Sequence, residues 1–370
     1  MKTAHPEPSL KEAFKNDFLI GAALNESQYC ESNSLEAAIV KEQFNSISPE
    51  NVLKWEKIHP EPGEYDFALA DCYVNFGVKN HMFIIGHNLV WHSQTPGWVF
   101  RDDNGNYIDR DTLLKRMREH IFTVVGRYKG KIGGWDVVNE ALNEDGTLRN
   151  SSWRKIIGDD YIEKAFEFAH QADPKAELYY NDFGLEKAPK RAGAIALVKK
   201  LRAEGIPITG VGLQGHYALD WPDDADLDET ISAFEKLGVK VMITELDVNV
   251  LPSPKRRSLD AEISDRYQMQ PGMNPYTNGL PEAVQQQLAE RYADFFSVFL
   301  KHRASISRVT LWGVTDGNSW LNDYPIRGRT SYPLLFDRDG KPKPAFFSVL
   351  KTAEMNSATK LTNDKSVSAR

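Results

Sequence analysis

Two glutamates, Glu140 and Glu245, each end a mostly apolar run of residues and could work as a pair. Glu140 follows the segment GGWDVVN, and Glu245 follows VMIT. A carboxyl group that ends such a run is desolvated, which raises its pKa and suits a general acid. Either glutamate alone could equally form a salt bridge at the rim of a sheet. Paired carboxylates that flank a bond are what the cleavage of a glycoside requires, so the pair favours that chemistry.

A histidine gives Glu245 surroundings that differ from those of Glu140. Asp247 shares a strand face with Glu245 through the two-residue period of a β-strand. Gln214 and His216 share a face of the preceding β-like run by the same period. We expect His216 to lie between the two carboxylates, where Asp247 orients it and it keeps Glu245 ionised. A lone histidine is more often an ordinary core residue, but the matching period on two adjacent strands favours a role in the site.

Three tryptophans lie at or just past the ends of β-like runs, away from helical core spacing: Trp91, Trp312 and Trp320. The flat face of an indole stacks on a pyranose ring, while the sugar hydroxyls bind polar groups elsewhere. One such tryptophan could simply pack on the protein, but three together predict a mouth that binds sugar. The polar side chains that end the β-like runs and would line this mouth are Glu50, Asn51, Lys54, His87, Asn139, Asn181 and Gln214.

A metal or nucleotide site receives little support from the sequence. His87, His92, His216, Glu245 and Asp247 could converge, but neither an HxH nor an HExxH spacing occurs. A rim rich in carboxamides suits hydroxyl groups better than zinc. The phosphate-binding motif GxxxxGK[ST] is also absent from the sequence. We therefore expect a reaction that needs no metal and no other cofactor.

These residues need a scaffold that gathers the ends of strands, and the rest of the sequence predicts one. Eight short β-like runs alternate with helical patterns, and several runs are almost continuously apolar, as in strands covered on both faces. Eight β-then-α units in series predict a parallel (β/α)8 TIM barrel, an α/β fold whose strand ends share one rim. A doubly wound sheet is the alternative, but it usually has fewer units. The β-like runs are residues 18–24, 45–49, 82–88, 134–139, 177–181, 208–215, 240–247 and 308–314, and the helical patterns are residues 34–43, 69–79, 111–128, 161–172, 188–204, 227–237, 282–302 and 345–353.

The organisation along the chain indicates a single catalytic domain over residues 1–355, followed by a polar tail over residues 356–370. The longest connection, residues 249–280, is rich in proline and glycine, and a long loop after a barrel strand is more often functional than idle. Cys30 and Cys72 define no disulfide framework and are expected to be reduced thiols. The first residues lack the apolar core of a signal peptide, which leaves open a cytoplasmic location or a targeting segment outside this numbering.

Composition limits the class of partner. The formal net charge is −7, which disfavours polyanions as partners, and no Lys/Arg run in the sequence suggests nucleic acid. No run of about 18 apolar residues exists, so no membrane span is predicted. Eight tryptophans and 11% aromatic residues agree with a ligand that has flat faces, such as a sugar.

Eight segments, spread from residue 50 to residue 346, form a pattern known from one family of enzymes. The segments are ENVLKWE (50–56), GHNLVWHSQTPGW (86–98), WDVVNEA (135–141), YYND (179–182), GLQGH (212–216), ITELDV (243–248), LWGVTDGNSW (311–320) and PLLFDRDGKPKPAF (333–346). In this order they closely resemble glycoside hydrolase family 10, the endo-β-1,4-xylanases. The resemblance covers about residues 10–355, which is nearly the whole chain.

The resemblance implies a barrel enzyme that hydrolyses xylan and xylo-oligosaccharides by a retaining double displacement, acting as a monomer. It assigns Glu140 as the acid/base, Glu245 as the nucleophile and Asn139 as the partner of the sugar 2-hydroxyl. Asp247 and Asn181 would support these residues. The remaining roles are a −1 subsite of Lys54, His87, Gln214 and His216, a −2 subsite of Glu50, Asn51 and Trp320, and a floor and wall of Trp91 and Trp312.

Two alternatives stay open at this point, and the chain departs from the family pattern in places. The same barrel and glutamate pair could serve a β-1,4-glucanase. A carbohydrate-binding barrel without activity would need a missing glutamate or a blocked cleft. Leu53 replaces a frequent methionine of the family, a change that conserves volume. The contacts of the loop over residues 249–280 do not carry over, and Tyr332 either contacts substituents of the sugar chain or packs.

Overall fold

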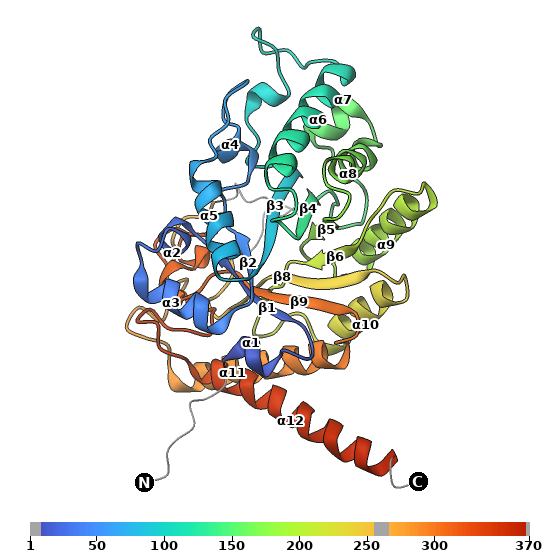
Figure 1. Cartoon of the computed structure of the whole chain (residues 1–370). Helices are drawn as coiled ribbons and strands as arrows, with labels where there is room; N and C mark the ends of the chain where they lie inside the picture. The colour runs from blue at the N-terminus through green and yellow to red at the C-terminus, as the bar shows by residue number, and fades with distance from the viewer. Residues whose placement is uncertain (1–8, 255–265, 368–370) are drawn as a thin grey trace.

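Eight parallel strands close into a barrel in the computed structural model, which describes residues 9–254 and 266–367 (Figure 1). The eight barrel strands are β1 (Leu19–Leu24), β2 (Ser46–Pro49), β3 (Phe83–Trp91), β4 (Gly134–Asn139), β5 (Glu177–Asp182), β6 (Gly210–Leu213), β8 (Lys240–Asn249) and β9 (Ile306–Leu311), and a short ninth strand, β7 (His216–Ala218), pairs with the end of β8. Each barrel strand pairs with the next from β1 to β6, β6 pairs with β8, and β9 joins β8 to β1. The predicted (β/α)8 TIM barrel is therefore confirmed.

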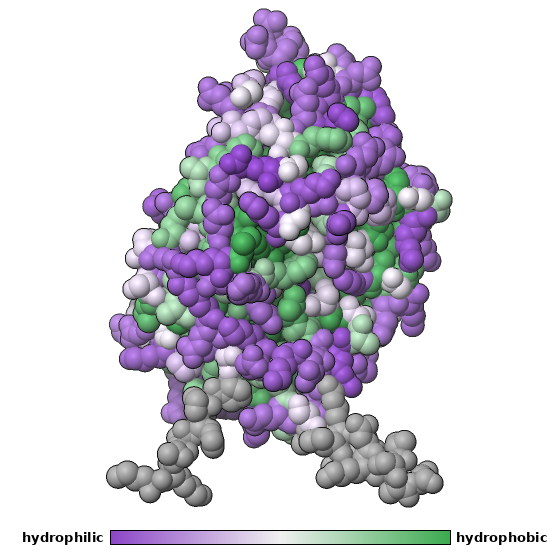
Figure 2. Space-filling model, viewed as in Figure 1, coloured by the Kyte–Doolittle hydropathy of each residue, from purple (hydrophilic) through white to green (hydrophobic). Residues whose placement is uncertain are grey.

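Helices cover the outside of the barrel and join one strand to the next (Figure 1). In α6, for example, Leu113, Met117, Ile121 and Val124 recur at helical spacing and are buried. The face seen in Figure 2 is largely hydrophilic, with apolar side chains gathered in patches near its middle. The helices are α1 (Leu10–Ala13), α2 (Glu26–Tyr29), α3 (Ser34–Gln43), α4 (Trp55–Ile58), α5 (Ala68–Lys79), α6 (Arg110–Arg127), α7 (Ser152–Ile157), α8 (Tyr161–Ala172), α9 (Ala188–Ala203), α10 (Asp224–Glu235), α11 (Glu282–Lys301) and α12 (Pro344–Val367).

The inside of the barrel is layered, with an apolar layer beneath a polar one. Ile85 of β3, Tyr179 of β5 and Met242 of β8 form a small buried cluster of their own. Successive side chains of a strand alternate between its two faces, so the residues two positions further along face the same way. Those residues, nearer the carboxyl ends of the strands, are His87, Asn181 and Thr244. The barrel therefore carries its polar groups at the rim where the sequence places them.

The sixth strand differs from its predicted course over residues 208–215. β6 stops at Leu213, and pairing with β8 resumes at His216 as the short strand β7. Gly215 lies between them with a φ of +80°, a conformation that glycine adopts without steric cost and that interrupts a β-ladder. The prediction of a single unbroken strand was wrong there, because a backbone turn is not visible in the apolar pattern.

Three further features bear on the organisation of the chain. Cys30 and Cys72 are free, exposed thiols. Within the part of the chain that the structure describes, no helix is both long and apolar enough to cross a lipid bilayer. Helix α12 continues to Val367, into the segment that the sequence sets apart as a polar tail. The boundary of the catalytic domain at residue 355 stays a prediction.

Candidate active site

A cleft of about 1040 Å³ opens at the carboxyl ends of the barrel strands. This volume exceeds that of a pocket for one small molecule, so the cleft has room for several sugar rings. Asn181 is fully buried beneath the cleft. The structure thus brings the whole predicted set of residues together. The predicted residues that line the cleft are Glu50, Asn51, Lys54, His87, Trp91, Asn139, Glu140, Gln214, His216, Glu245, Asp247, Trp312 and Trp320.

Glu140 follows the last residue of β4, and its carboxylate accepts hydrogen bonds from uncharged groups. The indole Nε1 of Trp91 donates to Oε2 at 2.9 Å, and the amide Nε2 of Gln214 donates to Oε1 at 2.9 Å. The amide Nδ2 of Asn139 donates to Oε1 at 3.3 Å. Glu140 is 8% exposed, and its backbone is left-handed, with a φ of +57°. A non-glycine residue pays for that conformation with strain, which often marks a functional position.

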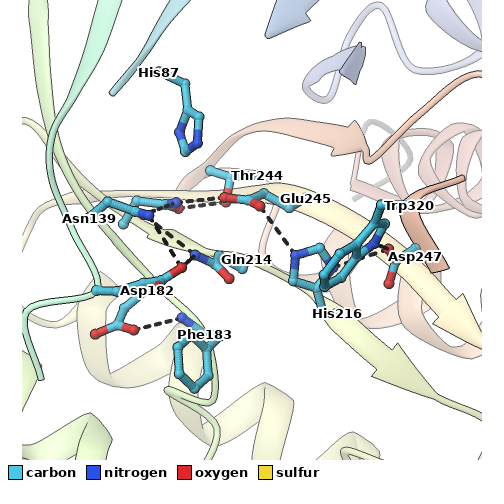
Figure 3. Close-up of polar contacts among 12 residues, drawn as sticks. His87, Asn139, Asp182, Phe183, Gln214, His216, Thr244, Glu245, Asp247 and Trp320 are labelled. Atoms are coloured by element: carbon cyan, nitrogen blue, oxygen red, sulfur yellow. Dashed lines mark hydrogen bonds and ion pairs between the residues drawn. The ribbon is translucent and has the colours of Figure 1, made fainter. Parts of the chain in front are cut away.

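Glu245, on β8, is held by a histidine and an amide (Figure 3). The Nδ2 of Asn181 donates to Oε1 at 2.8 Å, and Nε2 of His216 lies 3.2 Å from Oε2. The other ring nitrogen of His216 lies 3.1 Å from Oδ2 of Asp247. His216 therefore stands between the two carboxylates, in the arrangement that the strand periodicity predicts.

The protonation states of His216 and Glu245 follow from these contacts. Burial by itself lowers the pKa of His216, but the charge of Asp247 and the hydrogen bonds to both carboxylates raise it to about 10. Burial by itself raises the pKa of Glu245, but the hydrogen bond from His216, the nearby His87 and the amide of Asn181 outweigh burial and lower it. At neutral pH the site therefore holds an ionised Glu245 beside a cationic His216.

Trp320 is fixed in place by the far side of the same network. Its Nε1 donates to Oδ2 of Asp247 at 2.7 Å (Figure 3). Its ring stacks on Tyr324 at a centroid distance of 4.6 Å and lies 4.7 Å from the ring of His216. With one edge hydrogen-bonded and one face stacked, the indole forms a rigid wall of the cleft.

The loop after β2 carries a second polar cluster, which lines one end of the cleft. Nζ of Lys54 donates to Oδ1 of Asn51 at 3.0 Å and to Oε1 of Gln94 at 2.8 Å. Nζ also lies 5.0 Å from the ring centroid of Trp91. Burial lowers the pKa of Lys54 to about 8, against the attraction of nearby glutamates, and burial raises the pKa of Glu50 to about 7. The charge at this end of the cleft therefore changes near neutral pH.

His87 and Trp312 form a further part of the cleft wall. Nδ1 of His87 contacts Oδ2 of Asp136 at 3.0 Å, which orients the ring. The rings of His87 and Trp312 meet edge to face at 5.6 Å, and Trp312 meets His216 edge to face at 6.1 Å. Trp312 is therefore held between two imidazoles.

Sequence reasoning missed three residues that position the site: Gln94, Asp136 and Thr244. Gln94 donates to Oε1 of Glu56 at 2.8 Å while accepting from Lys54. The only signal for all three is their place inside the segments 86–98, 135–141 and 243–248. Their partners lie on other strands or loops, so no local pattern identifies the contacts.

The 249–280 loop and Tyr332, whose roles the sequence left open, differ in their relation to the cleft. Asn249, Ser253, Pro254, Arg266 and Tyr267 line the cleft, so the flanks of the 249–280 loop border it, while residues 255–265 lie outside the described residues. The side chain of Tyr332 packs: its hydroxyl donates to the backbone oxygen of Tyr276 at 2.7 Å, and it is not among the residues that line the cleft.

Over residues 9–254 and 266–367, no three His, Cys, Asp or Glu side chains are arranged to hold a metal ion.

A parallel barrel that presents two buried glutamates in an open, aromatic-lined cleft at its strand ends defines the glycoside hydrolases as the class of protein. The family model described as Glycosyl hydrolase family 10 matches residues 9–352. The chain belongs to this family.

Relatives and solved structures agree over almost the full length. The chain is 46% identical over 351 residues to endo-1,4-beta-xylanase A of Xylanibacter ruminicola, with 95% of each chain covered. It is 44% identical to an endo-1,4-beta-xylanase of Geobacillus stearothermophilus, with 93% of this chain and 98% of the relative covered. A solved GH10 endoxylanase from a sugarcane soil metagenome superposes with a TM-score of 0.88 at 45% identity, covering 93% of this chain and 99% of that one.

Proposed function

We propose that this chain is an endo-1,4-β-xylanase that hydrolyses internal bonds of xylan with retention of configuration, with Glu140 as acid/base and Glu245 as nucleophile. The observation that carries the assignment of roles is the difference between the two buried glutamates. Glu245 faces the cationic His216, whereas Glu140 accepts hydrogen bonds from the uncharged Trp91, Gln214 and Asn139. A carboxylate beside a cation stays ionised and can attack, which suits Glu245 to the role of nucleophile and leaves Glu140 as the acid/base of the pair.

The reaction then follows in two displacements. Glu140 gives its proton to the glycosidic oxygen as the bond to the anomeric carbon breaks, and the carboxylate of Glu245 forms a bond to that carbon. The leaving chain departs with the proton. In the second step Glu140, now ionised, removes a proton from water, and the resulting hydroxide displaces Glu245 from the same face. Two inversions restore the original configuration, and both glutamates return to their starting protonation states.

The names of the relatives and the rigid wall of the cleft support xylan as the substrate. Xylose lacks the hydroxymethyl group that glucose carries at C5, so a site can select xylose by leaving no room for that group. Trp320 cannot easily swing aside, because Asp247 holds its edge and Tyr324 its face. Initial rates on xylan and on carboxymethylcellulose test the substrate; faster hydrolysis of the cellulose derivative would reject it in favour of a β-1,4-glucanase.

Replacement of the nucleophile tests the roles. We expect Glu245→Ala to lower kcat by roughly 10⁴-fold or more while xylo-oligosaccharides still bind. Glu354→Ala, which removes an exposed carboxylate on α12, is the matched control and should keep full activity. Proton NMR of the first product should show the β-anomer. An α-anomer formed first, or near-normal turnover by Glu245→Ala, would contradict the mechanism.

The proposal includes a monomeric enzyme, since one chain contains every residue assigned to the reaction. Light scattering on the purified chain should give a mass close to 41.9 kDa. A dimer at catalytic concentrations would overturn this part alone and leave the chemistry unaffected.

A further inference from the structure

Asn181 lies at the centre of the polar layer and joins the two catalytic candidates. Its Nδ2 donates to Oε1 of Glu245 at 2.8 Å and to Oδ1 of Asn139 at 2.8 Å. Asn139 in turn donates to Glu140. The amide of Asn181 thus presents N–H groups to both halves of the site, and it can do so in only one of its two orientations.

The hydroxyl of Thr244 sets that orientation. Oγ1 of Thr244 donates to Oδ1 of Asn181 at 2.6 Å. A second acceptor, the backbone oxygen of Leu213, lies further away at 3.3 Å. If the Asn181 amide turned over, its oxygen would face the carboxylate of Glu245 and the carbonyl oxygen of Asn139, and three acceptors would meet without a proton between them. The short bond from Thr244 stabilises the productive orientation.

A glycine makes this contact possible across an intervening strand. Thr244 is on β8 and Asn181 is on β5, and Gly212 of β6 lies between them in register with Asn181. A Cβ at position 212 would lie 2.3 Å from Oδ1 of Asn181 and 2.8 Å from Cγ2 of Thr244. A side chain there would force the two residues apart. Side chains of the non-adjacent strands β5 and β8 therefore meet over Gly212, because β6 has no side chain at that position.

We propose that Thr244 is a positioning residue for the glycosidase reaction, because its hydroxyl fixes the Asn181 amide with its N–H groups toward Glu245 and Asn139. The polarity continues along a chain of donors from Thr244 through Asn181 and Asn139 to Glu140. Each bond of this chain is donated in the direction of Glu140, and Asn181 also donates to Glu245, which stabilises Glu245 in its ionised form and aims the amide of Asn139. The expected effect of Thr244 on turnover rests on the proposed function. The orientation of the Asn181 amide rests on the hydrogen bonds alone.

The test compares Thr244→Val, which removes the hydroxyl at nearly constant shape, with Thr244→Ser, which keeps the hydroxyl. For the valine variant we expect kcat/KM on a xylo-oligosaccharide to fall about tenfold, with most of the loss in kcat. The acidic limb of its pH profile should move up by about one pH unit, because Asn181, without the hydroxyl on its oxygen, is held less firmly as a donor to the ionised Glu245. The serine variant should stay within about twofold of the wild type and keep its acidic limb.

A second measurement does not depend on activity. Titration of the ¹³C-labelled carboxyl of Glu245 by NMR should give a higher midpoint in Thr244→Val than in the wild type or in Thr244→Ser. If valine does not fold at this position, Thr244→Ala gives the same comparison. An unchanged Glu245 midpoint and pH profile in a variant without the hydroxyl, even with a lowered Tm, would reduce Thr244 to a packing residue and overturn the proposal. Equal losses in the serine and valine variants would do the same. Failure of the proposed function would instead appear as a wild type that does not hydrolyse xylan.

Discussion

Lys190→Met removes the cation from an ion pair that is entirely enclosed by protein. Nζ of Lys190 lies 2.8 Å from Oδ1 of Asp182, and both side chains have no exposed surface. Asp182 also accepts a hydrogen bond from the hydroxyl of Tyr180 at 2.5 Å and from the backbone N–H of Phe183 at 2.9 Å. Phe183 lines the cleft, and Nζ of Lys190 lies 3.6 Å from its ring centroid. The pair therefore anchors a wall of the active site.

The expected loss of stability comes from the charge left behind on Asp182. Removing one partner of a buried pair costs about 3–5 kcal/mol, because the remaining ion has neither water nor a counter-charge. Burial already raises the pKa of Asp182, and Lys190 is the main group that opposes this shift. Without Lys190 that pKa rises further, so the folded variant binds a proton that the unfolded chain releases near pH 4. The stability of the variant should therefore decrease as the pH rises above 4, and the deficit should be larger at pH 8 than at pH 5.

Urea unfolding at pH 5 and pH 8 measures the effect in four proteins: the wild type, Lys190→Met, Asp182→Asn and the double variant. The double variant carries no buried charge at this place, so it should recover most of the stability that Lys190→Met loses. A loss below about 1 kcal/mol at pH 8 would refute the reasoning. A double variant as unstable as Lys190→Met would show that lost packing, and not an unpaired charge, is responsible.

Two further predictions concern buried groups away from the cleft. Nδ1 of His59 lies 3.2 Å from Nδ1 of His120, and burial lowers the pKa of His59 to about 4. As the pH falls, the unfolded chain therefore binds a proton at His59 before the folded chain does. About 3 kcal/mol of the free energy of unfolding should be lost between pH 6.5 and pH 4. Urea unfolding over this range should show a smaller fall for His59→Phe, and an identical acid limb would contradict the idea. A Cβ at Gly86 would lie 2.0 Å from the Trp135 ring, so Gly86→Ala should cost about 1–3 kcal/mol or more and lower Tm. Gly126→Ala in α6, where a Cβ meets nothing within 4 Å, should instead be neutral or stabilising, and equal Tm losses in both would refute the steric argument.

The sequence predicted those parts of the fold and site that depend on local order. Apolar runs followed by polar residues mark the strand ends, and helical spacing marks the covering helices, because both patterns arise within single elements. The two-residue period also places Glu245 and Asp247 on one face of β8, and His216 lies between them as expected. The break in the sixth strand at Gly215 escaped prediction, since a single left-handed residue leaves no trace in an apolar pattern.

What the sequence alone determined is which residues reach the rim of the barrel, including both glutamates, because the alternation of strand and helix fixes the rim and the strand period fixes the faces. What only the tertiary structure decided is how those residues differ from one another. Trp91 on β3 reaches Glu140 at the end of the neighbouring strand β4, Thr244 reaches Asn181 over Gly212, and Lys54 meets Gln94 forty residues away. Such contacts depend on the register between strands and on the course of loops, and a shift of one residue would turn each side chain to the opposite face. The protonation of the site follows from those contacts, so its chemistry is settled by packing rather than by composition.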